Sequence, residues 1–108
     1  MKQPFITSVF TASSHHPFHL PEKYKGKFPE GKHPILQCIA YTDYSIRQFF
    51  LKMSQYEWYY NTLFVIVADH TNSPVYDEYF TSIGRSSIPI LFYHPGSNLK
   101  GLVDSIPA

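Results

Sequence analysis

Three short apolar runs and one longer periodic segment organise the chain. Residues 5–11, 62–68 and 88–93 are rich in β-branched and aromatic side chains, which predicts three strands. Residues 34–54 repeat apolar side chains at helical spacing, which predicts a helix with one face on the sheet. The 62–68 run is apolar at nearly every position, so we expect it to be buried on both faces. Pro89 places the third strand at a sheet edge, or the proline at its first residue.

The order of these elements predicts a fold class. A strand, a helix and a second strand favour a right-handed parallel crossover, so we expect an α/β domain with a mostly parallel sheet. Between the first strand and the helix, residues 13–33 contain Pro17, Pro21 and Pro29 and cannot form regular structure. A loop of this length in a small domain is either functional or disordered, and its opening sequence, SSHHPF, favours function.

Composition limits the classes of protein. The 108 residues allow one small domain, and a hydrophobic fraction of 44% is ample for a core. A net charge of +1 gives no general case for nucleic acid binding. The lone Cys38 cannot form an internal disulfide and is expected to be a small buried hydrophobe. No apolar stretch approaches the roughly 20 residues that span a bilayer, so the chain as given is expected to be soluble.

The 62–68 run stops abruptly at Asp69 and His70. Open α/β folds place their chemistry at such strand ends. A carboxylate oxygen and an imidazole nitrogen together suit a divalent cation such as Zn²⁺, Mn²⁺ or Fe²⁺. Two ligands are not a full site, however, and the alternative is that Asp69 caps a turn while His70 is a surface residue.

Four strings in the same order resemble the sulfatase group of the alkaline phosphatase superfamily, and within it the lipoteichoic acid synthase and phosphoglycerol transferase branch. They are TASSHHPF at 11–18, AYTDYSIRQFF at 40–50, NTLFVIVADH at 61–70 and IGRSSIPILFY at 83–93. Nearly the whole chain is covered. The resemblance implies part of an alkaline-phosphatase-like three-layer sandwich with a mostly parallel sheet and one main crossover helix.

The same resemblance implies a metal-dependent hydrolase or transferase of phosphate or sulfate esters, with lipid-linked or glycan substrates. Asp69 and His70 match the family's late metal ligands, and the ion is typically Mn²⁺, with Zn²⁺, Mg²⁺ and Ca²⁺ as alternatives. His15 matches the histidine that contacts the substrate phosphate or the leaving group. Arg85 is a weaker candidate for contact with an anionic ligand, because loop arginines more often pair with surface carboxylates. In one parallel sheet, His15 and Asp69 would converge at the same rim.

The resemblance also shows a departure from the family pattern. The family's nucleophile and first metal carboxylate lie well before the histidine motif, whereas only residues 1–14 precede His15 here, so we assign no nucleophile. We therefore expect residues 1–108 to be a single partial domain, the C-terminal part of a catalytic domain that is inactive alone. The parent enzyme would be anchored in the cell membrane with an extracytoplasmic catalytic domain. The apolar surface that stays exposed in the partial domain should make this domain self-associate.

Two alternatives stay open from the sequence. The chain could be a standalone remnant that keeps the fold and acts as a binding or assembly module without catalysis. It could also be an independent small α/β domain with an accidental resemblance, in which case a non-parallel sheet and a distant His15 and Asp69 would be expected.

Overall fold

The computed structural model describes residues 4–71, 74, 76–98 and 101. The chain divides into two compact units, Met1–Met53 and Ser54–Ala108, and each is described by itself. No helix in the described part of the chain has both the length and the apolar character needed to cross a membrane.

The first unit is built on one long helix, α1, Pro34–Met53, which confirms the helix predicted for residues 34–54. Pro34 begins the helix, where its missing N–H costs nothing because the first-turn amides have no partner in the helix. Cys38 is fully buried, as expected of a small hydrophobe. Whether α1 packs on a sheet stays a prediction.

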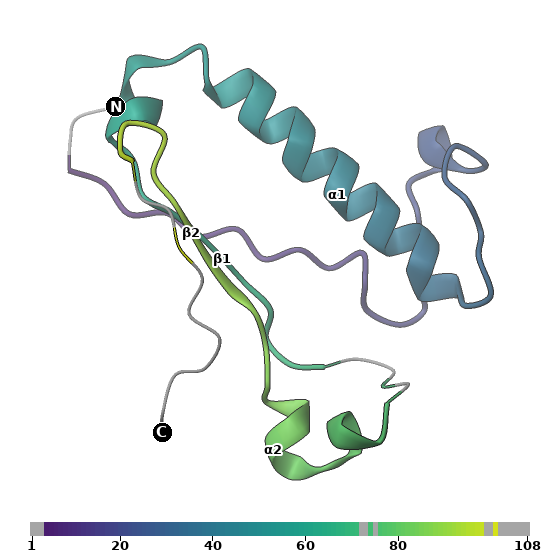
Figure 1. The fold of residues 1–108 in the computed structure, drawn as a ribbon. Coiled ribbons are helices and arrows are strands. Elements are labelled where there is room, and N and C mark those ends of the chain that lie inside the picture. Colours follow the sequence, from purple (N-terminus) through teal and green to yellow (C-terminus); the bar gives the residue numbers. More distant parts are fainter. Residues whose placement is uncertain (1–3, 72–73, 75, 99–100, 102–108) are drawn as a thin grey trace. The chain divides into compact units, whose positions relative to one another are not determined.

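The 13–33 loop runs beside the N-terminal part of α1 (Figure 1), and aromatic side chains join the two. Tyr24, in a short 3₁₀ helix at Glu22–Tyr24, lies 5.0 Å from Tyr41 and 5.8 Å from Tyr44 between ring centroids. Phe28 lies 6.0 Å and 5.7 Å from the same two helix residues. The Gln37 amide also donates to the Phe28 carbonyl at 3.3 Å. Tyr41 and Tyr44 of α1 therefore serve packing, and they hold part of the long loop in place.

The predicted strand at residues 5–11 is wrong for this structure, in which residues 4–11 form no strand. The side chains of Ile6, Val9 and Phe10 are 101%, 82% and 82% exposed. β-branched and aromatic residues favour strands because they pack on a pleated neighbour, and residues 4–11 are paired with none.

The second unit contains the sheet, which has two strands in the described part of the chain: β1, Phe64–Val67, and β2, Ile90–Tyr93. The strands are antiparallel, with Phe64 opposite Tyr93 and Val67 opposite Ile90. The expectation of a mostly parallel sheet is therefore wrong for the described strands. The two later strand predictions are confirmed with shorter bounds, and Pro89 stands immediately before β2.

The strand β1 is not buried on both faces, which corrects the second expectation about it. Its residues alternate between half-buried and exposed, and Val65 and Val67 are 50% and 54% exposed. All of β2 is exposed. Successive side chains of a strand point to opposite faces, so Phe64 and Ile66 lie on the better covered side of β1, whereas β2 has no covered side.

Between the strands lie a short 3₁₀ helix, Asp77–Phe80, and α2, Ser82–Arg85. A further 3₁₀ helix, Glu57–Asn61, precedes β1 and carries Tyr59, which is 6% exposed. The Tyr59 ring contacts Phe64 at 5.3 Å and Tyr93 at 6.5 Å between centroids, so one buried aromatic side chain closes the end of the sheet.

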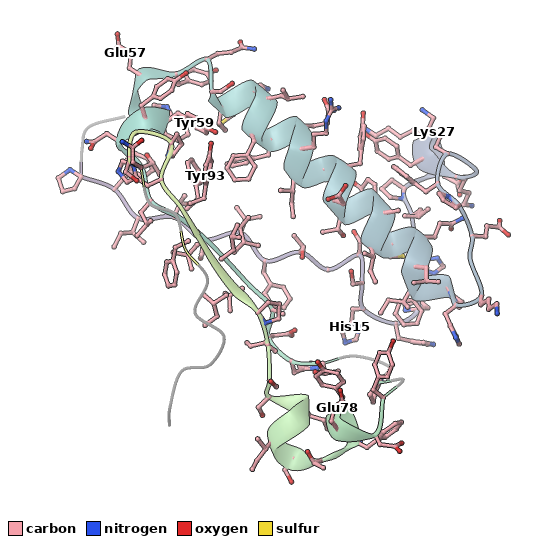
Figure 2. All side chains as sticks on the ribbon, viewed as in Figure 1. His15, Lys27, Glu57, Tyr59, Glu78 and Tyr93 are labelled. Atoms are coloured by element: carbon pink, nitrogen blue, oxygen red, sulfur yellow. The ribbon has the colours of Figure 1, made fainter. Side chains whose placement is uncertain are left out.

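The hydroxyl groups of Tyr59 and Tyr93 lie 3.2 Å apart (Figure 2). Burial raises the pKa of Tyr59 to about 12, and the hydrogen bond to Tyr93 and the negative charge that Tyr93 would gain add to the rise. The folded state thus holds this proton more tightly than the unfolded chain does, in which tyrosine titrates near ~10.

We expect the stability that Tyr59 contributes to be complete below about pH 10 and lost as the pH rises to about 12, a difference of about 3 kcal/mol. Residue-resolved NMR of the tyrosine Cζ carbons should show Tyr59 ionising last. Tyr93→Phe should lower its pKa only partly, since burial remains, and Tyr56→Phe at an exposed position is the control. Ionisation of Tyr59 together with the exposed tyrosines would contradict this account.

Candidate functional site

Asp69 and His70 follow β1 after one intervening residue, Ala68, so they stand at the strand end as the sequence predicted. Val67 is the last paired residue of the strand, opposite Ile90, so the two candidate ligands begin two residues beyond the sheet. Their side chains are exposed, by 60% for Asp69 and 65% for His70. The pair is therefore accessible to an ion and a substrate.

The two side chains are held in a defined arrangement. One carboxylate oxygen of Asp69, Oδ1, accepts from the His70 backbone N–H at 2.9 Å. The His70 Nδ1 lies 3.1 Å from the Thr71 carbonyl oxygen. A carbonyl oxygen can only accept, so this contact is a hydrogen bond when Nδ1 carries the proton, and in that neutral tautomer Nε2 holds the free lone pair. That Nε2 lies 3.5 Å from the second oxygen of Asp69, Oδ2.

This arrangement fits half of a metal site. Two ligands that each lie about 2.0–2.2 Å from one ion are separated by about 3.0–3.6 Å, and the Oδ2 to Nε2 distance of 3.5 Å falls in this range. An unprotonated imidazole nitrogen and a carboxylate oxygen suit first-row divalent cations. The described residues contain no cluster of three or more Cys, His, Asp and Glu side chains, so further ligands would have to come from elsewhere.

His15 lies in the 13–33 loop of the first unit and is exposed (Figure 2). Its backbone N–H donates to Ala12 at 3.1 Å, and its carbonyl accepts from the Phe18 N–H at 2.8 Å, so the motif forms tight turns. Its Nδ1 lies 2.8 Å from the carbonyl oxygen of His16. By the same argument as for His70, Nδ1 carries a proton and Nε2 is the atom that can gain or lose one.

The predicted site residues are therefore distributed over both units. Asp69, His70 and Arg85 belong to Ser54–Ala108, whereas His15 belongs to Met1–Met53. The convergence of His15 and Asp69 stays a prediction. The Arg85 side chain is exposed and forms no ion pair with a described residue, so its proposed contact with an anionic ligand also stays a prediction.

Two residues near the pair were not singled out from the sequence. The Thr71 N–H donates to the Arg85 carbonyl at 2.9 Å, and the Thr71 hydroxyl donates to the Gly84 carbonyl at 3.4 Å. These bonds join the segment after β1 to α2. The only signal in the sequence was Gly84 itself, which stands in the Gly- and Ser-containing break before the last predicted strand.

Comparison with known protein families gives the class of protein. The model of the sulfatase family matches residues 1–104, and the chain belongs to this family, as the four strings indicated. Membership of this family implies an alkaline-phosphatase-like α/β fold. Enzymes of the family hydrolyse or transfer sulfate or phosphate esters and generally use a divalent metal ion.

Among individual proteins, the chain is similar to lipoteichoic acid synthase 1 of Bacillus subtilis. The two are 32% identical over 75 residues, which is 65% of this chain and 12% of the synthase. The chain thus spans a small part of the length of this relative. No solved structure matches the chain.

Proposed function

We propose that this chain supplies part of the catalytic domain of a metal-dependent phosphoric- or sulfuric-ester hydrolase or transferase. In this proposal Asp69 and His70 hold one divalent cation and His15 contacts the ester. The observation that carries it is the pair formed by Asp69 Oδ2 and His70 Nε2, 3.5 Å apart, with the remaining polar atoms of both side chains held by backbone groups.

When bound, a divalent cation would supply charge neutralisation at the non-bridging oxygens of the ester and would lower the pKa of an attacking hydroxyl. Mn²⁺ is the ion that the family resemblance favours, with Zn²⁺, Mg²⁺ and Ca²⁺ as alternatives. The contribution of the chain is to orient Oδ2 and Nε2 toward one point before binding, which reduces the reorganisation needed at the site.

His15 would act through Nε2. With Nδ1–H donated to His16, protonation at Nε2 gives a donor that can bind a phosphate or sulfate oxygen, or deliver a proton to the leaving oxygen. A group that binds the ester must be reachable from solvent, and His15 is exposed. Arg85 is a further, weaker candidate for the same anion.

The larger context of the enzyme is also part of the proposal. We infer that residues 1–108 are one partial domain, the C-terminal part of a three-layer sandwich whose remaining strands make the sheet mostly parallel, and that it is inactive alone. The substrate would be a lipid-linked or glycan ester, because the similar protein is named as a lipoteichoic acid synthase. The parent would be membrane-anchored with this domain outside the cytoplasm, which protease treatment of intact cells would test.

Titration of the chain with Zn²⁺ and with Mn²⁺ in a calorimeter tests the metal proposal. We expect one weak site per chain, because only two protein ligands are in place, and loss of detectable binding in Asp69→Ala and in His70→Ala. Asp77→Ala, another exposed carboxylate of the second unit, should leave binding unchanged.

The same preparation tests the role of His15. Addition of glycerol phosphate should shift the His15 ring signals in NMR spectra, and His15→Gln should weaken binding several-fold, whereas His19→Gln in the same loop should not.

Metal binding that survives both Asp69→Ala and His70→Ala would refute the enzyme proposal and favour a standalone binding or assembly module.

We also propose that the chain self-associates through its sheet. In the described part of the chain the sheet has two strands, so the outer edge of each has no strand beside it. Several apolar side chains of the two strands, and of the residue before β1, are about half exposed: Leu63, Val65, Val67, Leu91 and Phe92. Open edges and exposed apolar faces of this kind favour association.

Sedimentation velocity over a range of concentrations should therefore show dimers or larger species. Val65→Lys, which places a charge on the sheet, should shift the population toward monomer. Ile83→Lys is the matched control, because Ile83 is 85% exposed but lies in α2. A monomeric wild-type chain at high concentration would overturn both self-association and the argument that a partial sheet is exposed.

A further inference from the structure

We propose that Thr71 is a positioning residue that holds His70 in the Nδ1–H form, with Nε2 free beside Asp69, and that the α2 turn in turn holds Thr71 through Gly84 and Arg85. This inference rests on the proposed function for its consequence in metal binding. Its structural content can be tested without any metal.

The first step concerns the Thr71 carbonyl. It lies 3.1 Å from His70 Nδ1 and competes for the single proton of the neutral ring with the Asp69 Oδ2, which lies farther away, 3.5 Å from Nε2. Without this acceptor the neutral ring would be free to place its proton on Nε2, and that nitrogen could then no longer donate a lone pair to a cation. Ligating histidines usually have their second nitrogen fixed in this way.

The second step concerns what fixes the carbonyl. Thr71 donates from its other two polar groups, with its N–H to Arg85 at 2.9 Å and its hydroxyl to Gly84 at 3.4 Å. The residue is only partly exposed, unlike Asp69 and His70. All three polar groups of Thr71 are thus engaged, one toward His70 and two toward α2, so a displacement of α2 would move the carbonyl that faces the imidazole.

The third step concerns the turn itself. The Thr81 hydroxyl accepts from the Gly84 N–H at 2.9 Å and donates to the Glu78 carbonyl at 3.0 Å, which draws α2 against the preceding 3₁₀ helix. A Cβ at Gly84 would lie 1.8 Å from the Glu78 carbonyl oxygen, so the turn accepts no larger residue without a backbone shift. Gly84 is therefore the position at which a one-carbon change would displace the acceptors of Thr71.

The test is ¹⁵N NMR of the histidine rings in the complete 108-residue chain without metal, at about pH 8.5, above the ~6.5 at which histidine ordinarily titrates. His70→Gln identifies the His70 signals. In the wild type we expect Nδ1 protonated and Nε2 unprotonated. Gly84→Ala should move His70 toward the Nε2–H form, and Thr71→Val, which loses only the longer hydroxyl bond, should do so less.

Two internal controls separate positioning from a general loss of structure. The His15 ring lies in the first unit, where it contacts the His16 carbonyl, and its signals should stay the same in every variant. Thr71→Ser retains the hydroxyl and should behave as the wild type. If Gly84→Ala loses its amide dispersion, Thr71→Val against Thr71→Ser carries the test.

Zn²⁺ affinity of the same variants gives the second readout, and we expect it to fall about 10- to 100-fold in Gly84→Ala. The inference would be overturned if the wild-type His70 were protonated on Nε2. It would also be overturned if Gly84→Ala and Thr71→Val both left the tautomer of His70 unchanged. A wild-type chain that binds no Zn²⁺ but shows the expected tautomer and its response supports the role of Thr71 and refutes only the proposed metal site.

Discussion

The antiparallel pairing of β1 with β2 is the constraint on which the second unit depends. Because Val67 is opposite Ile90, the end of β1 and the start of β2 are fixed side by side, and everything between them must close a loop back to the same point. That loop contains Asp69, His70 and α2. The Thr71 to Arg85 bond lies just beyond the last strand pair and continues the connection between the two arms. Asp69 and His70 therefore lie between the last strand pair and the Thr71 to Arg85 hydrogen bond. Because both ends of this short segment are held, their side chains can be exposed and still have a defined geometry.

Backbone carbonyls have the same role at both candidate histidines. His15 and His70 each place Nδ1 within hydrogen-bond distance of the carbonyl of the next residue, His16 and Thr71. Each of these contacts joins neighbouring residues, so the orientation of each ring does not depend on the other unit.

How far the sequence predicted this protein differs between its elements. The periodic 34–54 segment became α1, and the apolar runs at 62–68 and 88–93 became β1 and β2, because these patterns match local backbone geometry. The run at 5–11 did not become a strand, because a strand needs a partner that no local pattern supplies. The order of the elements favoured a parallel pairing with that run, whereas the described sheet joins the two later strands. The same limit applies to the candidate site, for which residue types suggested Asp69, His70 and His15 but not Thr71.

The sequence by itself determined the family, the helix and two strands, and it supplied the candidate site residues, because these depend on side-chain type and short-range spacing. The tertiary structure decided the direction of strand pairing, the exposed faces of the sheet, the burial of Tyr59 and the link from Thr71 to α2. Each of these joins residues 12 or more positions apart, or depends on what covers a surface. Hydrogen bonds and packing between such segments follow from the three-dimensional path of the chain, which the pattern of single residues does not encode locally.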